Sequence, residues 1–461
     1  MAKHETFRFN SLDELNDKIR QLNVNITIGT DVAPLAKPVK AGGLTAPNAL
    51  AILPMEGCDS NPDGSPSELV ERRYTRLGAG GAGLIWWEAC AITGEGRANP
   101  LQMMLTKDNV HRFSSLMRAV NRQAENANGH RPVHVLQLTH SGRYCRPNGH
   151  KPMPLIPQHD PLLDARVGLT ADSEVISDAY LQSLVPRYVQ SARLAREAGF
   201  DGVDIKACHR YLISELLASR TRAGAYGGSF ENRSRLLREI IAEVRREMGP
   251  DFLIACRFNV FDAHPYPYGF GEDKDNFMRY DPAEPMQLVR MLCESGVGLL
   301  SNSAGNPYYI YPQVTRPFDQ SSMGIPVPEE HPLESIARLF DFTRQIQQAA
   351  GGVPVVGNGY SWLRQFLAYA GAANLADNSC GFIGLGRQAF AYPDAPRDIL
   401  SGRGMDPKKS CIACSKCTQI MRDHGCTGCV IRDAAVYGPL YTQARRDAEQ
   451  RAAASGVTVF Q

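Results

Sequence analysis

The sequence of 461 residues predicts an α/β protein built on a (β/α)8 (TIM) barrel, with an extension at each end. Short apolar runs of the length of a buried strand occur eight times, and amphipathic helical segments lie between them. Regular alternation of strand and helix is typical of a parallel sheet, and eight such units in one domain favour a closed barrel over an open sheet. The expected strands are 49–54, 83–88, 133–138, 202–206, 252–257, 297–302, 353–358 and 382–386.

The helices between these strands show an apolar stripe with helical period. They are expected at 67–77, 108–128, 178–198, 231–248, 285–295 and 333–350. A further short helix is predicted after Ser11, a good N-cap that is followed by the acidic residues Asp13 and Glu14. We therefore expect an N-terminal extension over 1–40, a barrel over 41–403, and a cysteine-rich segment with a C-terminal tail over 404–461.

The composition excludes several functional classes. A hydrophobic content of 43% supports a large core, and a net charge of +2 gives no electrostatic reason to bind nucleic acid or a membrane surface. The first residues lack an apolar signal segment, and no apolar run is long enough to cross a membrane. The sequence therefore predicts a soluble, cytoplasmic protein. A homo-oligomer is compatible with these features.

Five of the twelve cysteines lie between Cys411 and Cys429. Cys411, Cys414 and Cys417 have the spacing C-x2-C-x2-C, and Cys429 follows twelve positions later, which suits an iron–sulfur cluster held by thiolates. A zinc ion held by Cys411, Cys414, Cys426 and Cys429 is the alternative. Disulfides are a third option, but the other cysteines are scattered through apolar stretches, as free thiols in a reducing compartment are.

The barrel prediction locates the active site. In such barrels the functional residues lie at the carboxyl ends of the strands. Two connections at this rim, 144–177 and 259–283, are too long for simple turns, and we interpret them as walls or lids of a substrate pocket. Tyrosines near the rim suggest an aromatic wall suited to a flat, bulky apolar substrate. They are Tyr266, Tyr268, Tyr308, Tyr309 and Tyr311.

Over residues of about 40 to 435, the sequence resembles the old yellow enzyme family of FMN-dependent oxidoreductases. The most specific matches are Asp201-Gly-Val-Asp-Ile-Lys-Ala-Cys-His-Arg-Tyr-Leu-Ile213 and Tyr226-Gly-Gly-Ser-Phe-Glu-Asn-Arg233. Together with the cysteines, they resemble the branch typified by 2,4-dienoyl-CoA reductase and trimethylamine dehydrogenase. That resemblance implies a 4Fe-4S cluster on Cys411, Cys414, Cys417 and Cys429.

The resemblance also implies an FMN site of strand-end residues. Gln137 on the third strand would read the pyrimidine side of the flavin, and Arg257 on the fifth would stabilise the reduced ring near N1 and O2. Gly357, Gly359 and Gly386 would let backbone N–H groups approach the phosphate, and Arg387 would add a charged contact. The complete set expected around the flavin is Pro54, Met55, Glu56, Ala89, Gln137, Arg257, Gly357, Gly359, Gly386 and Arg387.

The family's chemistry implies roles for three residues after the fourth strand. Tyr211 matches the tyrosine that donates a proton to the substrate carbon during reduction of a C=C bond. His209 and Lys206 match the two positions that hydrogen-bond the substrate carbonyl oxygen. Lys206 departs from the usual histidine, and it could serve either as this donor or as an ion-pair partner of Glu56 or Glu88.

These features predict an FMN- and 4Fe-4S-dependent ene-reductase acting on an α,β-unsaturated carbonyl compound, such as a steroid-like cyclic enone or an aromatic enoate. The stretch Asn306-Pro-Tyr-Tyr309 stands where dienoyl-CoA reductases have a histidine, and Arg210 stands where the family usually has glycine. One alternative is an amine dehydrogenase or demethylase with a bowl of Trp86, Trp87 and Trp362. The other is a non-catalytic electron carrier or zinc-stapled scaffold.

The last expectation concerns the source of electrons. No G-x-G-x-x-G motif in a βαβ context follows the cysteines, so the sequence predicts no dinucleotide-binding domain there. We expect electrons to enter through the cluster from a separate donor protein, with direct reduction by NAD(P)H as the alternative.

Overall fold

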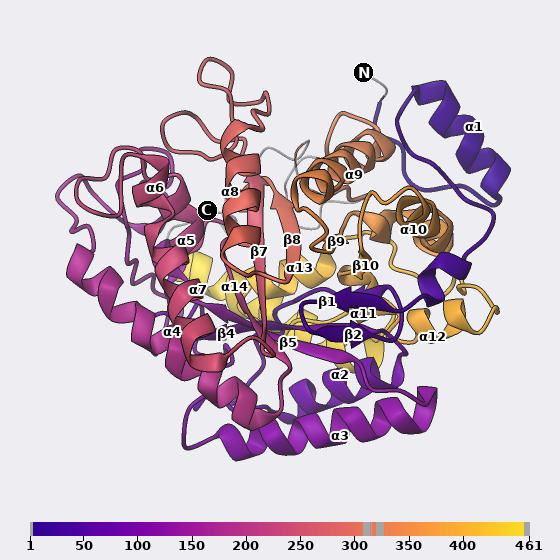
Figure 1. The fold of residues 1–461 in the computed structure, drawn as a ribbon, viewed down its shortest axis with the longest axis horizontal. Coiled ribbons are helices and arrows are strands. Elements are labelled where there is room, and N and C mark those ends of the chain that lie inside the picture. The colour runs from indigo at the N-terminus through magenta and orange to yellow at the C-terminus, as the bar shows by residue number, and fades with distance from the viewer. Residues whose placement is uncertain (1–2, 308–313, 315, 320–326, 456–461) are drawn as a thin grey trace.

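The computed structural model of the protein describes residues 3–307, 314, 316–319 and 327–455. Eight parallel strands close into a barrel in the order β10-β3-β4-β5-β6-β7-β8-β9, which confirms the predicted (β/α)8 architecture (Figure 1). Each of the eight expected apolar runs overlaps one of them. The strands are β3 (Leu50–Ile52), β4 (Leu84–Ala91), β5 (Val133–Thr139), β6 (Gly202–Ile205), β7 (Leu253–Phe261), β8 (Leu299–Ala304), β9 (Val355–Gly357) and β10 (Phe382–Leu385).

The helices lie outside the barrel and cover the outer face of the strands (Figure 1). The main ones are α2 (Glu68–Ala79), α3 (Val110–Asn128), α4 (Asp178–Ala198), α7 (Arg235–Met248), α8 (Ala283–Glu294), α9 (Pro332–Ala349) and α10 (Leu367–Ala376). The helix expected over 231–248 is divided at Ser234 into α6 (Phe230–Arg233) and α7. Serine N-caps begin α2 and α4, where Ser67 and Ser177 accept from the backbone N–H groups of Val70 and Tyr180.

The remaining described helical elements range from three to 22 residues. They are α1 (Leu12–Leu22), η1 (Ala33–Ala36), η2 (Gly142–Tyr144), η3 (Ala165–Val167), α5 (Leu212–Leu217), η5 (Tyr360–Phe366), α11 (Arg387–Ala391), α12 (Ala395–Leu400), α13 (Lys416–Arg422) and α14 (Ala434–Ser455). Ser11 caps α1 as predicted, since its side chain accepts from the backbone N–H of Glu14 at 3.2 Å.

A two-stranded hairpin closes the amino-terminal end of the barrel. It consists of β1 (Val39–Ala41) and β2 (Leu44–Ala46), which pair antiparallel. Its buried alanines, Ala41 and Ala46, share an apolar cluster with the first residues of four barrel strands. Those residues are Leu84, Val133, Leu253 and Leu299. The hairpin therefore covers the end at which the strands begin, and a ligand site is expected at the other end, where the strands have their carboxyl ends.

Residues 3–40 pack closely on the barrel. The ring of Phe7 makes an edge contact with Trp362, with 5.3 Å between ring centroids, and its backbone N–H donates to Asp319. Fully buried Leu35 accepts from the backbone N–H of Ala49 at the start of the barrel. The boundary predicted at residue 40 falls inside β1, so the extension and the barrel form one continuous core.

Candidate functional site

The predicted flavin residues lie together at the carboxyl ends of the strands. Ala89 of β4 and Gln137 of β5 are direct neighbours in the parallel pairing, next to a shift of register at Trp87. Arg257 lies in the middle of β7, and Glu56 follows β3. The carboxyl-terminal side of such a barrel is where a shared ligand is expected, and the flavin roles of these residues stay predictions.

A buried aspartate that the sequence analysis missed organises two of them. Asp204 of β6 accepts from Gln137 Nε2 at 2.6 Å, from Trp86 Nε1 at 3.0 Å and from the backbone N–H of Arg257 at 2.9 Å. Burial raises the pKa of Asp204 to about 6, although these donors and the nearby Arg257 charge favour the carboxylate. Asp204 fixes Gln137 and the Arg257 backbone as one rigid unit. The only sequence signal was an acid inside the apolar run 202–205.

The ion-pair alternative for Lys206 is confirmed. Its ammonium Nζ lies 3.0 Å from Glu56 Oε1, whereas Glu88 is bound by Arg73 at 2.6 Å. The same ammonium lies over the ring of Tyr211, 4.0 Å from the ring centroid. Tyr211 is buried and packs in a small apolar cluster with Tyr144 and Val167. The lysine and the predicted proton donor are therefore direct neighbours, and a catalytic role for Lys206 stays a prediction.

A serine links the flavin side of the site to His209. The hydroxyl of Ser303, on β8, accepts from Arg257 Nε at 3.2 Å and lies 3.2 Å from His209 Nε2. Burial, together with the charges of Arg257 and Lys206, lowers the pKa of His209 well below its usual value. His209 is therefore a neutral imidazole, with one ring nitrogen that can donate.

The predicted phosphate-binding residues include a glycine with positive φ and a buried arginine. Gly359 has φ of +97°, a left-handed conformation that favours glycine, and it begins η5. Gly386 immediately precedes α11, whose first residue, Arg387, is buried. Arg387 Nη2 donates to the carbonyl of Pro317 at 3.3 Å, while its Nη1 is buried without a hydrogen-bond partner among the described residues. A buried guanidinium with a free N–H is suited to an anion.

The four predicted cluster ligands line one pocket. Cys411, Cys414, Cys417 and Cys429 border it together with Arg387. Two of the sulfurs accept backbone N–H groups, Cys411 from Ala413 at 3.4 Å and Cys429 from Arg432 at 3.3 Å. A second guanidinium, that of the half-buried Arg316, lies within electrostatic reach of Cys411, Cys417 and Arg387, and desolvation and the Arg387 charge lower its pKa to about 9. Cations and N–H donors around the sulfurs suit an anionic thiolate-bound cluster.

Cys426 lies elsewhere, outside this pocket. Burial is the main cause of the rise in the pKa of its thiol to about 11. The nearby Asp59 charge adds to the rise, and the Arg73 charge opposes it. Its neighbour Thr427 donates its backbone N–H to the Gly57 carbonyl at 2.6 Å. Among the described residues, no group of three or more His, Cys, Asp or Glu side chains is close enough to hold a metal ion, and this applies to both proposed cysteine sets. The two sets differ in that Cys426, a member of the zinc set alone, does not line the pocket.

The cysteine-rich segment is anchored on the open end of the barrel. The backbone N–H of Cys411 donates to Gln388 Oε1 after β10, and Arg422 donates to the carbonyl of Pro307 after β8. On the other side, Arg146 after β5 lies 3.4 Å from His424. These contacts place the cysteine pocket beside the predicted flavin phosphate residues.

The aromatic residues differ in part from expectation. Trp86, Trp87 and Trp362 do not form a common bowl, because each is buried in different surroundings. Trp86 bonds to Asp204, Trp87 stacks on Tyr74 and Trp362 bonds to Asp319. Tyr266 is 40% exposed, beside Arg220 and Lys274. Tyr308, Tyr309 and Tyr311 lie outside the described residues.

A buried acid stands in the long connection after β7. Both carboxylate oxygens of Glu272 lack a hydrogen-bond partner among the described residues, and Arg220 Nη1 lies 3.6 Å from Oε1. Burial, reinforced by the charge of Asp262, raises the pKa of Glu272 from 4.5 to about 8. An acid with a raised pKa in the folded state adds stability that is complete below its unfolded pKa and is lost as the pH rises through its folded pKa.

We expect Glu272→Gln to abolish this pH dependence. Between pH 5 and pH 9, the wild-type free energy of unfolding should fall relative to that of the variant by about 2–4 kcal/mol. Urea unfolding of both proteins at pH 5, 7 and 9 measures the difference. Parallel pH profiles for the two proteins would contradict the raised pKa.

Comparisons with known proteins agree with this arrangement. A sequence model described as "NADH:flavin oxidoreductase / NADH oxidase family" matches residues 34–280. The chain is 27% identical to the NADH oxidase of Thermoanaerobacter brockii over 82% of its own length and 52% of that protein. It is 30% identical to the NADPH dehydrogenase of Halalkalibacterium halodurans, over 59% of its own length and 74% of that protein.

A solved structure of 2-naphthoyl-CoA reductase with 2-naphthoyl-CoA shares the fold, with a TM-score of 0.69 at 18% identity. The match covers 87% of this chain and 57% of that one. The chain thus spans about half the length of the NADH oxidase and of the reductase. Across its described residues, no helix is long and apolar enough to span a membrane.

Proposed function

The chain belongs to the NADH:flavin oxidoreductase / NADH oxidase family, of the old yellow enzyme type, and from this premise we propose that it is an FMN- and 4Fe-4S-dependent ene-reductase. Its substrate would be an α,β-unsaturated carbonyl compound. The observation that carries the proposal is the Ser303 hydroxyl, which contacts Arg257 on the flavin side and His209 on the substrate side.

The residues present fit FMN. Gln137 and Arg257, held by Asp204, would bind the ring, and Gly359, Gly386 and the unpartnered Nη1 of Arg387 would bind the phosphate. When bound, FMN supplies the hydride that is transferred to the C=C bond. The chain's part is to bind the flavin, to polarise the substrate and to deliver a proton.

Three side chains would act on the substrate. The neutral His209 and the Lys206 ammonium would donate to the carbonyl oxygen and stabilise the negative charge that develops there. Tyr211 would give its phenolic proton to the carbon that does not receive hydride. Glu56 holds Lys206, and the Lys206 ammonium lies over the ring of Tyr211, so the three side chains form one connected group.

The cysteine pocket would hold a 4Fe-4S cluster on Cys411, Cys414, Cys417 and Cys429, and electrons would enter through it from a separate donor protein. Its contact with Arg387 supports this route, because the pocket and the proposed phosphate site share that residue. The exposed cations Arg403, Lys408 and Lys409 precede Cys411, and Arg403 and Lys409 share the carboxylate of Asp398. The remaining excess of positive charge suits an acidic electron carrier. Rapid turnover of the purified protein with NADH or NADPH alone would contradict this route.

An anaerobic reoxidation experiment tests the function. Protein reduced with dithionite, and freed of the excess, should regain its oxidised flavin absorbance when mixed with 2-cyclohexenone or cinnamate. Oxidised protein should keep its colour when mixed with trimethylamine, which would bleach the flavin of an amine dehydrogenase. Bleaching by the amine with no reoxidation by either enone or enoate would overturn the proposal.

A further inference from the structure

We propose that Arg210 is a positioning residue that fixes the loop carrying His209 and Tyr211 to both long connections at the mouth of the barrel. The proposal rests on the proposed function for its effect on the reaction. Its structural half, the coupling of three segments by one guanidinium, rests on contacts of the described residues alone. These segments are 145–177, the loop 206–211 and the connection 262–282.

The backbone at Arg210 is unfavourable for any residue except glycine. His209 and Arg210 have φ of +64° and +59°, so two successive side-chain-bearing residues are left-handed. Their backbone N–H groups are held by Asn259 Oδ1 at 3.1 Å and Ser214 Oγ at 3.2 Å. A residue that strains the backbone here calls for a compensating role of its side chain.

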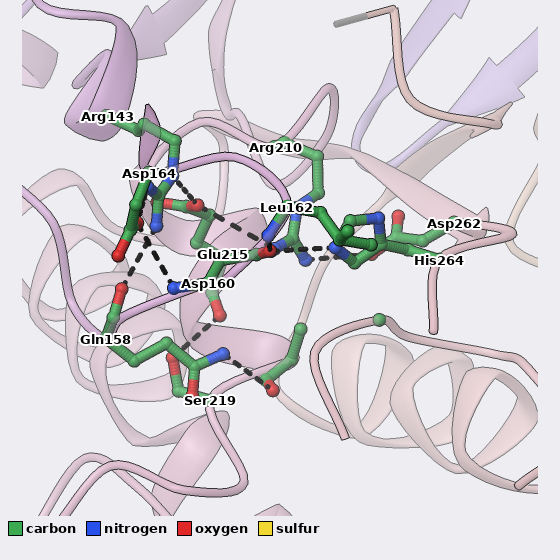
Figure 2. A network of polar contacts seen from close by, with 12 residues as sticks. Arg143, Gln158, Asp160, Leu162, Asp164, Arg210, Glu215, Ser219, Asp262 and His264 are labelled. Carbon is green, nitrogen blue, oxygen red and sulfur yellow. Dashed lines mark hydrogen bonds and ion pairs between the residues drawn. The ribbon is translucent and has the colours of Figure 1, made fainter. Parts of the chain in front are cut away.

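The Arg210 side chain lies among several carboxylates, as Figure 2 shows. The side chain is fully buried, with Nη1 3.1 Å from Asp262 Oδ2 and Nη2 3.1 Å from Asp160 Oδ2. Asp160 belongs to the connection after β5 and Asp262 to the one after β7, so the planar guanidinium bridges both. Glu215 of α5, 3.7 Å away, adds a third carboxylate.

The same acids bind further groups of the two connections. His264 Nε2 lies 2.7 Å from Asp160, and the fully buried Arg143 contacts Glu215 at 2.6 Å and also Asp164. Figure 2 shows these side chains converging on one buried cluster. Since removing one member of such a buried network leaves its partners unpaired, the cluster holds or loosens as a unit.

Arg210 can hold the proposed reacting residues in place because it lies between His209 and Tyr211 in the sequence. His209 contacts Ser303 on one side, and Tyr211 lies under Lys206 on the other. A shift of the Arg210 backbone moves both residues relative to the flavin site. Small displacements of reacting groups cost large factors in rate.

The test compares Arg210→Lys with Arg222→Lys in the FMN- and cluster-loaded protein. Arg222 is the matched control, because it is also buried and also holds 145–177, through the carbonyl of Pro157. It lies outside the 206–211 loop, however, and its other partner is Asp178 instead of a residue of the connection after β7. Lysine keeps the positive charge in each case but lacks the planar guanidinium that can bond two carboxylates at once. We expect Arg210→Lys to lower the limiting rate of flavin reoxidation by saturating 2-cyclohexenone at least tenfold, and Arg222→Lys to change it less than threefold.

Hydrogen exchange supplies a second readout that needs no turnover. Arg210→Lys should speed amide exchange in 145–177 and 262–282 together, whereas Arg222→Lys should affect only the first of these. Asp160→Asn, which leaves residues 206–211 unaltered, should act in the same direction and serves if the Arg210 variant does not fold. A wild-type limiting rate, or exchange that changes in neither connection, overturns the inference. Failure of the wild-type protein to react with enones would instead count against the proposed function.

Discussion

Replacing Cys414 by alanine is expected to remove the iron–sulfur cluster while FMN stays bound. Wild-type protein isolated without oxygen should contain about four iron and four acid-labile sulfide per chain, and Cys414→Ala close to none. The reason is that Cys414 lies on the wall of the pocket shared by the four proposed ligands. Chemical analysis of iron, sulfide and FMN on the same sample measures the result.

Cys426→Ala is the matched control, since this thiol belongs to the same segment but lies near Asp59 and Arg73, outside the pocket. It should keep its full iron content. In the Cys414 variant, reduction of the flavin by a donor protein should be blocked more strongly than reduction by dithionite, which reaches the flavin directly. Equal loss of metal in both variants, with zinc in the wild type, would contradict the cluster assignment.

Tyr211→Phe is expected to slow reoxidation of the reduced flavin by an enone about 100-fold, because the phenolic proton is lost from the transition state. The ring itself is retained, so its packing with Tyr144 and Val167 and its contact with Lys206 should persist. Anaerobic stopped-flow absorbance of the flavin, at saturating 2-cyclohexenone, gives the rate.

Ferricyanide provides the control for this variant. It takes electrons from the flavin without needing a proton on carbon, so Tyr211→Phe and wild type should be reoxidised by it equally fast. An unchanged rate with the enone would remove Tyr211 from the mechanism. Slower oxidation by both acceptors would show instead that the substitution disturbs the flavin site.

The barrel was predictable because each of its strands is an apolar run of the right length, and the strand ends then indicated where a flavin is expected. The grouping of four cysteines on one pocket was predictable because their spacing within a short segment is local. The role of Asp204 was not predictable, because its partners Trp86, Gln137 and Arg257 lie on three other strands that are distant in the sequence. The partner of Lys206 remained open because Glu56 and Glu88 stand at the ends of neighbouring predicted strands. Only the structure shows that Glu88 pairs with Arg73, whereas Glu56 pairs with Lys206.

Two further differences have simple physical causes. Trp86 and Trp87 are consecutive on β4, so their side chains must point to opposite faces of the strand, and the bowl expected from both was geometrically excluded. In the sequence, Arg210 stood out only as a residue at a position where the family usually has glycine. Its left-handed backbone and its carboxylate partners on two separate connections depend on how those connections fold, which no local pattern specifies.

The hairpin of β1 and β2 has a kinetic consequence for the proposed enzyme. With the far mouth of the barrel plugged, the organic substrate must arrive and its product must leave on the same face that carries the cysteine-rich segment. A docked electron carrier would then hinder the entry of substrate and the release of product. Reduction of the flavin by the carrier and its reoxidation by the substrate would therefore have to alternate. High concentrations of either reactant should inhibit the half-reaction of the other.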